Sequence, residues 1–249
     1  MSTAIVTGAA RGIGLATTKL FLAEGRRVAM IDRDADELAV AAAGLTNVLP
    51  IACDVSDEAQ VKAMIAEVAA DFGSIDALVN NAGVADFRPM GDTDMQVWRH
   101  VMAVNLDGVF LVSQTAIPHM TRGRGAIVNI ASISGLRAST LRVAYGTSKA
   151  AVIHLTRQQA AELGEIGIRA NCVAPGPVDT KLALAVHSPA IRAAYHDAIP
   201  LNRYGREDEI AEVIVFLCSE KASYVTGQTI AADGGFDATG VGLPALRNP

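Results

Sequence analysis

The sequence predicts a doubly wound α/β fold, in which helices cover both faces of a parallel sheet. Short apolar runs, rich in β-branched residues, alternate with longer segments of helical period, as in repeated strand–helix–strand units. The runs are almost wholly apolar, which indicates strands that are buried on both faces. The seven runs are residues 3–7, 27–31, 48–52, 77–80, 126–131, 168–174 and 228–232.

The segments between these runs carry the apolar stripe of amphipathic helices. In residues 57–72, for example, apolar side chains recur at spacings of three and four, which places them on one helix face. No internal repeat, low-complexity tract or linker rich in serine and proline interrupts the pattern. We therefore expect a single domain over residues 1–249, with a C-terminal extension over about residues 237–249.

The composition excludes several classes of protein. A net charge of −5 argues against a nucleic-acid partner, which usually needs a clustered basic surface. We expect neither a membrane span nor a secretory signal, because no run approaches 18 apolar residues and no charged segment precedes an apolar one at the start. The three cysteines form no C-x-x-C pair and are expected to be buried free thiols in a reducing, cytoplasmic setting.

The first strand leads into a glycine-rich turn, TGAARGIG, that contains Gly8, Gly12 and Gly14. Such glycines let the backbone approach a pyrophosphate, and the following helix offers free N–H groups and a partial positive charge. The spacing differs from the standard G-x-G-x-x-G fingerprint, so a plain tight turn stays an alternative for this motif alone. Because no Gly-Lys-Ser/Thr ending follows, an ATP or GTP site is not predicted.

An acid at the end of the second strand addresses the choice of dinucleotide. Asp32 follows Gly14 by 18 residues, where a carboxylate accepts hydrogen bonds from ribose hydroxyls and repels a 2′-phosphate. This favours NAD(H) over NADP(H), although Arg11 or Arg33 can face a 2′-phosphate. Asp54, after the third strand, is interpreted either as an adenine contact or as a turn or capping acid.

The stretch VAYGTSKAA places Tyr145 and Lys149 four residues apart among small neighbours, on one face of a helix. A free phenol has a pKa of about 10, and a nearby cation favours its phenolate form. We therefore predict that Lys149, with an oxidised nicotinamide, lowers the pKa of Tyr145 by about two to three units and makes it a general acid–base group. The alternative is a tyrosine packed on a lysine stem at an exposed helix surface.

Two further polar residues, Ser132 and Asn105, lie at positions where they can bind a substrate or a water molecule. Ser132 follows the fifth strand, and ligands bind outside the carboxyl ends of strands in open α/β sheets. Its hydroxyl can hold a substrate oxygen beside Tyr145; Ser134 is a rival, and a turn serine bonded to its own backbone is the alternative. Asn105 lies in an apolar helical segment, where an amide can interrupt the helical hydrogen bonds and hold a water.

Taken together, these motifs resemble the classical short-chain dehydrogenases/reductases. The resemblance covers nearly everything from Thr3 to about Phe236, and it includes NNAG at 80–83 and PGPVDT at 175–180, which resembles the segment that closes over the nicotinamide. It implies a Rossmann-type fold with a seven-stranded parallel sheet, NAD(P)-linked oxidoreduction and usually a homotetramer.

The resemblance also implies the residues of the site. Its catalytic set corresponds to Asn105, Ser132, Tyr145 and Lys149, with Asn105 holding a water that links Lys149 to solvent. The cofactor contacts expected from the matched motifs and the residues above are Gly8, Arg11, Gly12, Ile13, Gly14, Asp32, Asp54, Val55, Asn81, Ala82, Gly83, Tyr145, Lys149, Pro175, Gly176, Val178 and Thr180.

The expected reaction is the interconversion of a secondary alcohol and its ketone. Tyr145 takes the hydroxyl proton while hydride leaves the carbon for the nicotinamide, Lys149 binds the ribose, and Ser132 orients the substrate. Open alternatives are an NADP(H)-linked reductase of 3-oxoacyl groups or simple ketones, an isomerase or dehydratase, and a non-catalytic nucleotide sensor. A sensor is expected to have lost one of these three residues, and all are present.

Specificity is expected to reside in three loops, at residues 84–89, 135–142 and 181–205, the last having helical period at 189–198 and the length of a lid. Their polar residues favour a hydroxylated or anionic small substrate, such as a sugar or polyol. These residues are Asp86, Arg88, Arg137, Arg142 and His187. No histidine has partners at the spacing of metal ligands, so no metal is expected.

Overall fold

The computed structural model describes residues 2–180 and 187–240. Its seven strands form one sheet in the order β3-β2-β1-β4-β5-β6-β7, and each neighbouring pair is parallel. The predicted fold class is therefore confirmed, and the strands match the expected runs closely. They are β1 (Thr3–Thr7), β2 (Arg27–Asp32), β3 (Val48–Ala52), β4 (Ala77–Asn80), β5 (Ala126–Ile130), β6 (Arg169–Pro175) and β7 (Thr229–Ala232).

The apolar runs of the central strands are explained by burial on both faces of the sheet. Ala4 and Val6 of β1 belong to one core cluster, whereas Ile5 between them belongs to a second cluster. None of the three is exposed to solvent. Since successive side chains of a strand point to opposite faces, both faces of β1 require apolar residues.

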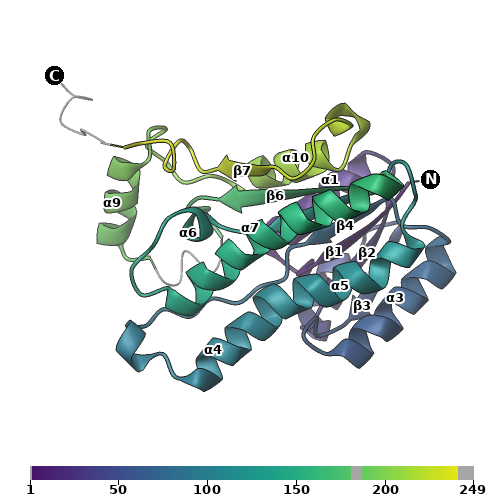
Figure 1. The fold of residues 1–249 in the computed structure, drawn as a ribbon, viewed down its shortest axis with the longest axis horizontal. Coiled ribbons are helices and arrows are strands. Elements are labelled where there is room, and N and C mark those ends of the chain that lie inside the picture. The colour runs from purple at the N-terminus through teal and green to yellow at the C-terminus, as the bar shows by residue number, and fades with distance from the viewer. Residues whose placement is uncertain (1, 181–186, 241–249) are drawn as a thin grey trace.

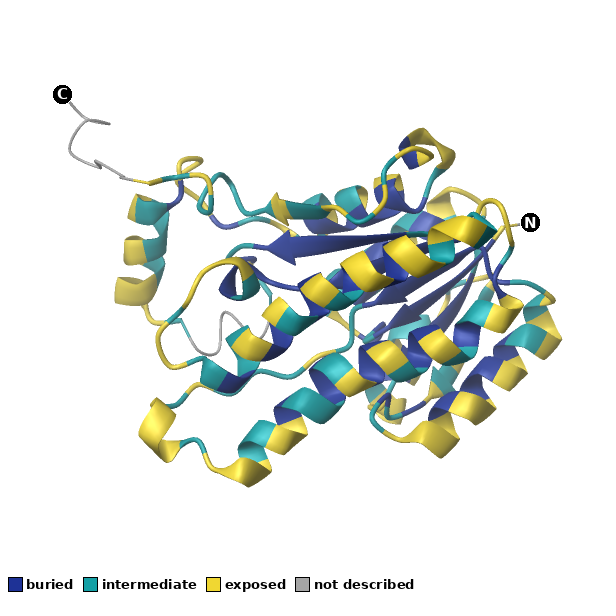
Figure 2. Ribbon diagram, in the orientation of Figure 1, coloured by how far each residue is buried: buried dark blue, intermediate teal, exposed yellow. Residues whose placement is uncertain are grey.

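Two groups of helices provide this cover, and their buried faces turn toward the sheet (Figures 1 and 2). The first cluster includes Phe21, Leu38 and Ile210 of α1, α2 and α10. The second includes residues of α3, α5 and α7. The bounds are α1 (Gly12–Ala23), α2 (Ala35–Ala42), α10 (Glu207–Leu217), α3 (Glu58–Phe72), α5 (Gly108–Ala116) and α7 (Val143–Leu163). The 3₁₀ turns are Met90–Asp92, Ile117–His119, Gly164–Ile166 and Glu220–Ala222.

One long helical segment contains a local irregularity. Helix α4 (Met95–Met102) continues through a π-helical turn, Ala103–Asp107, into α5. By length and composition alone, the segment Met95–His119 reaches the threshold for a membrane-crossing helix, and 44% of its most apolar window is buried inside the fold. Helix α5 packs on α3 and β4, and α4 packs on α7, so this segment forms part of the packed layer on one face of the sheet.

The strand order reverses between β1 and β4, which opens a crevice at the carboxyl ends of the strands. Helices α6 (Ile133–Leu136) and α9 (Pro189–Ala198) lie at that end of the sheet (Figure 1). Helix α9 agrees with the helical period expected at 189–198. Residues 181–186 of the expected substrate loop and 241–249 of the expected extension lie outside the described residues. The single-domain assignment stays a prediction.

Candidate active site

Two adjoining cavities occupy the crevice at the carboxyl ends of the strands. The larger, of about 640 Å³, is bordered by the glycine-rich turn and the ends of β2 and β3. The smaller, of about 270 Å³, is bordered by α7 and the ends of β5 and β6. The two form one continuous groove, because both are lined by Ile13, Asn81, Gly83, Val84 and Thr180.

The glycine-rich turn needs its glycines for specific geometric reasons. Gly8 and Gly12 have φ of 65° and 60°, in the left-handed region that favours glycine. A Cβ on Gly14 would lie 2.1 Å from the Gly8 carbonyl oxygen, so α1 packs directly on the turn. Gly8, Arg11, Gly12 and Ile13 line the larger cavity, whereas Gly14 lies behind the turn and lines neither cavity.

The acid at the end of β2 faces the larger cavity. The Asp32 carboxylate accepts hydrogen bonds from the backbone N–H groups of Ala10 and Asp34, each at 3.1 Å, which fixes it beside the glycine-rich turn. The guanidinium of Arg11 forms an ion pair with Asp34. Asp34 thus already pairs with the charge of Arg11. Arg33, the other arginine that can face a 2′-phosphate, also lines this cavity.

Asp54 and Asn81 line the larger cavity, and each is held in place by hydrogen bonds. The Asp54 carboxylate accepts bonds from the Ser56 hydroxyl at 2.7 Å and the Ser56 N–H at 2.9 Å. The hydroxyl bond is the main reason that the pKa of Asp54 is lowered. Asp54 therefore acts as a turn acid, one of the two interpretations that the sequence left open. It also lines the larger cavity, as do Val55 and Ala82. Asn81 donates to the carbonyl oxygens of Thr7 and Gly8 and so ties β4 to β1.

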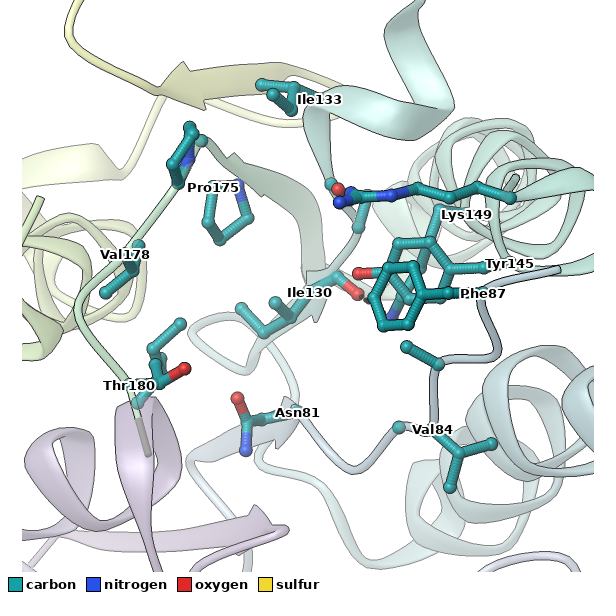
Figure 3. Close-up of a pocket in the computed structure, with 18 of the residues that line it drawn as sticks. Asn81, Val84, Phe87, Ile130, Ile133, Tyr145, Lys149, Pro175, Val178 and Thr180 are labelled. Atoms are coloured by element: carbon teal, nitrogen blue, oxygen red, sulfur yellow. Dashed lines mark hydrogen bonds between the residues drawn. The ribbon is translucent and has the colours of Figure 1, made fainter. Parts of the chain in front are cut away.

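The smaller cavity brings together Ser132, Tyr145 and Lys149, the last two of which are labelled in Figure 3. Ser132 accepts a hydrogen bond from the Ser134 N–H at 3.1 Å and also bonds the Tyr145 side chain. It therefore serves as a turn residue and faces the tyrosine as well. The rival Ser134 does not line the cavity, and its hydroxyl lies 3.2 Å from that of Ser139.

The ionisation of Tyr145 depends on its burial and on neighbouring side chains. In the chain by itself, burial raises the pKa of the phenol above its ordinary value of 10, while the Ser132 hydrogen bond and the charge of Arg142 act in the opposite direction. The pKa shift in the chain without cofactor comes from burial, Ser132 and Arg142, and the Lys149 ammonium donates to the Ile130 carbonyl oxygen at 2.7 Å. The Nζ atom lies 5.8 Å from the centroid of the tyrosine ring. The expectation that Lys149 and an oxidised nicotinamide together lower this pKa stays a prediction. Burial lowers the pKa of Lys149 itself to about 8.

Asn105 lies in the π-helical turn and is fully buried. It accepts from the Val84 N–H at 2.8 Å and donates to the Val84 carbonyl at 2.9 Å and the Ser148 hydroxyl at 3.1 Å. The amide thus occurs where the regular helix is interrupted, as expected, and π turns often mark functional sites. Asn105 does not line either cavity, but a Cβ on Gly83 would approach its Oδ1 to 3.2 Å and the Lys149 Nζ to 3.4 Å.

The segment after β6 borders the smaller cavity. Pro175, Gly176, Val178 and Thr180 all line it, as Figure 3 shows for Pro175, Val178 and Thr180. A Cβ on Gly176 would lie 2.7 Å from the Cα of Asp233, so only glycine fits this close backbone approach.

Comparison with known proteins agrees with this arrangement. A family model described as enoyl-(acyl carrier protein) reductase matches residues 8–237. The chain belongs to the short-chain dehydrogenase/reductase (SDR) family. It is 42% identical over 236 residues to a 3-oxoacyl-(acyl-carrier-protein) reductase of Thermotoga maritima, with 93% of this chain and 96% of that protein covered.

Two further relatives support the assignment to the SDR family. A galactitol 2-dehydrogenase (L-tagatose-forming) of Cereibacter sphaeroides is 42% identical over 239 residues, which cover 94% of each protein. The crystal structure of an SDR glucose/ribitol dehydrogenase from Brucella melitensis superposes with a TM-score of 0.91 at 34% identity, covering 94% of this chain and 96% of that one. This SDR is therefore an oxidoreductase of CH–OH groups that uses a nicotinamide dinucleotide and a small-molecule substrate.

The groove of this SDR fits such a cofactor. Gly8 and Gly12 line the larger cavity, and a Cβ on Gly8 would lie 2.8 Å from the Asn81 Nδ2, so the turn approaches β4 closely and exposes its backbone to a ligand. The described residues hold no cluster of three or more histidine, cysteine, aspartate or glutamate side chains that could bind a metal ion.

Sequence reasoning did not single out the aromatic wall of the smaller cavity. Phe87 and Tyr195 line it together with His187, whose Nδ1 lies 3.0 Å from the hydroxyl of Tyr204. The ring centroids of His187 and Tyr195 are 5.4 Å apart. The available signal was the presence of these aromatic residues in the loops already expected to set specificity.

Proposed function

We propose that this SDR is an NAD(H)-dependent oxidoreductase that interconverts a secondary alcohol and its ketone by acid–base catalysis through Tyr145. One observation carries the proposal. Tyr145, Ser132 and Lys149 line a single cavity that continues into a groove with a glycine-rich turn and a carboxylate. The phenol of Tyr145 thus lies in a cavity that adjoins the one bordered by the glycine-rich turn and Asp32, as a transfer of hydride and proton between dinucleotide and substrate requires.

Each of these side chains has a distinct role in the proposal. Tyr145 takes the proton of the substrate hydroxyl during oxidation and returns it during reduction. Ser132, bonded to the tyrosine side chain, holds the substrate oxygen beside it. Lys149 binds ribose hydroxyls and supplies positive charge near the phenol. The nicotinamide, when bound, supplies the hydride chemistry.

Asn105 acts in this proposal as a positioning residue. Its hydrogen bonds hold Val84 and Ser148 beside Gly83 and Lys149. We propose that it also helps to hold a water that passes protons between Lys149 and solvent.

The cofactor assignment to NAD(H) rests on Asp32. Its carboxylate is fixed by two backbone N–H groups at the edge of the larger cavity, where it accepts ribose hydroxyls and repels a 2′-phosphate. Arg11 and Arg33 are the two arginines that favour NADP(H). The ion pair of Arg11 with Asp34 makes its charge less available to a 2′-phosphate. We propose that the cofactor contacts named from the sequence hold the dinucleotide, with Gly14 acting through the packing of α1.

The substrate proposal is a hydroxylated small molecule such as a sugar or polyol. The polar loop residues and the resemblance to a galactitol dehydrogenase favour it. The alternative is an NADP(H)-dependent reductase of 3-oxoacyl groups or simple ketones, which the similarity to the Thermotoga maritima reductase favours. Comparison of NADH with NADPH, and of polyols with 3-oxoacyl thioesters, separates the two.

Replacement of Tyr145 by phenylalanine tests the proposed chemistry. We expect turnover to fall by about 10²–10⁴-fold, the usual contribution of a general acid–base group, while NADH binding measured by fluorescence is retained. A screen of sugars, polyols, hydroxy acids and secondary alcohols with NAD⁺ identifies the substrate. Appreciable turnover by Tyr145→Phe would overturn the assignment, and a wild-type protein that binds NADH without turnover would favour the nucleotide sensor. Turnover of a substrate without net NADH formation would favour an isomerase or dehydratase.

We also propose a homotetramer in a reducing, cytoplasmic setting. Phe110 on α5 is 47% exposed, and a large apolar side chain on a helix that covers the sheet suits burial against a second copy. All three cysteines, Cys53, Cys172 and Cys218, are buried and free. Light scattering of the purified protein measures the number of subunits.

A further inference from the structure

The smaller cavity carries positive charge without a compensating acid. Among the described residues that line it, the cationic side chains are Arg142 and Lys149, and none is an aspartate or glutamate. The ammonium of Lys149 bonds the Ile130 carbonyl, and the proposed function uses this lysine for cofactor and phenol. Arg142 has no part in the reaction as proposed so far.

The contacts of Arg142 differ from those of the neighbouring loop arginines. Arg88 and Arg137 each form an ion pair with an aspartate and line no part of the cavity. Arg142 donates to the Ser134 hydroxyl at 3.2 Å and lies over the Phe87 ring, 4.8 Å from its centroid. No carboxylate within residues 2–180 and 187–240 forms an ion pair with it. Since a guanidinium has five N–H donors, these contacts leave most of them available to a ligand.

Arg142 belongs to the substrate end of the groove. It immediately precedes α7 and lies three residues before Tyr145, and both residues line the smaller cavity. It lines the smaller cavity and not the larger one, which separates it from the phosphate-binding turn. Burial raises the pKa of Tyr145 and lowers that of His187, and the positive charge of Arg142 lowers both, as expected for a cation close to each.

We propose that Arg142 binds an anionic group of the substrate, so that this SDR prefers a small secondary alcohol that carries a carboxylate or sulfonate near its carbinol carbon. A planar guanidinium holds such a group through two parallel hydrogen bonds. The inference rests on the proposed function and narrows its substrate class from hydroxylated compounds in general to hydroxy acids. The Phe87 ring, whose centroid lies 4.8 Å from the Arg142 Cζ, lines the same cavity and packs against the guanidinium.

Matched substrates and variants test this inference. The probes are 3-hydroxybutyrate, 4-hydroxypentanoate and 2-hydroxypropane sulfonate, which vary the length and the acid group, and the methyl esters of the two carboxylates, which lack the charge. We expect the wild-type protein to prefer an acid to its ester. Arg142→Gln is expected to raise KM for the acid about 10–100-fold, as for loss of hydrogen bonds to a charged group, with little change in kcat and with ester turnover retained.

Two further variants separate binding from structure. Arg142→Lys keeps the charge and is expected to recover part of the lost affinity for the acid. Arg99→Gln removes an exposed charge on α4, outside the cavity, and is expected to leave both substrates unaffected. The inference is overturned if the wild-type protein prefers the esters, or if Arg142→Gln slows acid and ester equally.

Binding measurements test the anion site at Arg142 separately from the proposed oxidoreductase activity. Acetoacetate is titrated by calorimetry into the protein–NAD⁺ complex, which has no hydride to transfer to the ketone, with the wild type and with Arg142→Gln. Binding that is lost in the variant supports the anion site even if none of the chosen alcohols is oxidised, and absent or equal binding overturns it. Failure of the proposed function shows itself differently, as retained turnover in Tyr145→Phe or as no oxidation of any alcohol, charged or neutral.

Discussion

The ammonium of Lys149 donates its hydrogen bond to the carbonyl oxygen of Ile130, 2.7 Å away, at the last residue of β5. The lysine is therefore anchored to the sheet, and its Nζ lies 5.8 Å from the centroid of the Tyr145 ring. A cation fixed in this way can serve a ligand and a phenol in the same cavity, but its burial has a cost for the stability of the protein.

That cost predicts how stability depends on pH. Burial lowers the pKa of Lys149 from 10.5 to about 8, so between these values the unfolded chain binds more protons and stability rises with pH. The loss of stability caused by burying the charged ammonium is therefore complete below a pH of about 8, and it disappears as the pH approaches 10.5. We expect Lys149→Met to increase the free energy of unfolding by about 1–3 kcal/mol below pH 8, with a smaller difference near pH 10. Urea denaturation at several pH values measures this, and a difference that does not change with pH would contradict it.

The phenol of Tyr145 is predicted to ionise in two different ranges. Without cofactor, burial raises its pKa above 10, and with NAD⁺ bound we expect the positive charge of the pyridinium to lower it. Difference absorbance between wild type and Tyr145→Phe follows the ring in each state. Ionisation at the same pH with and without NAD⁺ would remove the electrostatic basis of the proposed mechanism.

Asp32 is predicted to decide between the two dinucleotides. Asp32→Asn keeps an amide oxygen for the N–H groups of Ala10 or Asp34 but removes the negative charge. We expect the ratio of kcat/KM for NADH to that for NADPH to fall by about tenfold or more, the effect of about 1.4 kcal/mol. Steady-state kinetics with both cofactors measures the ratio. Glu37→Gln, which removes a charge from the same cavity wall, serves as the control, and an unchanged ratio in Asp32→Asn would reject the role.

The packing of α1 on the glycine-rich turn is predicted to be sensitive to a single methyl group. Gly14→Ala places a Cβ 2.1 Å from the Gly8 carbonyl oxygen, and the overlap forces the turn to move. We expect a loss of about 1–3 kcal/mol of stability together with weaker NADH binding. Gly164→Ala is the matched control, because nothing lies within 4 Å of its Cβ and its φ is −57°. Equal effects of the two substitutions would show that the overlap is unimportant.

The sequence by itself determined the fold class, and it predicted most of the polar residues that line the two cavities, although it did not single out Phe87 and Tyr195. The apolar runs are determined by burial on both faces, so their positions could be read from the amino acids alone, and Asn105 was expected to interrupt a helix. The Tyr145–Lys149 spacing likewise follows from helix geometry, which depends only on local distances along the chain.

Only the tertiary structure decided how these groups act on one another. The direction of the Lys149 ammonium, the raised pKa of Tyr145 and the selection of Ser132 over Ser134 depend on contacts between β5, α6 and α7. The difference between Arg142, which has no acidic partner among the described residues, and the paired Arg137 likewise arises from chain segments far apart in sequence. Burial and long-range pairing set the charge of a side chain, and neither is encoded in the spacing of neighbouring residues.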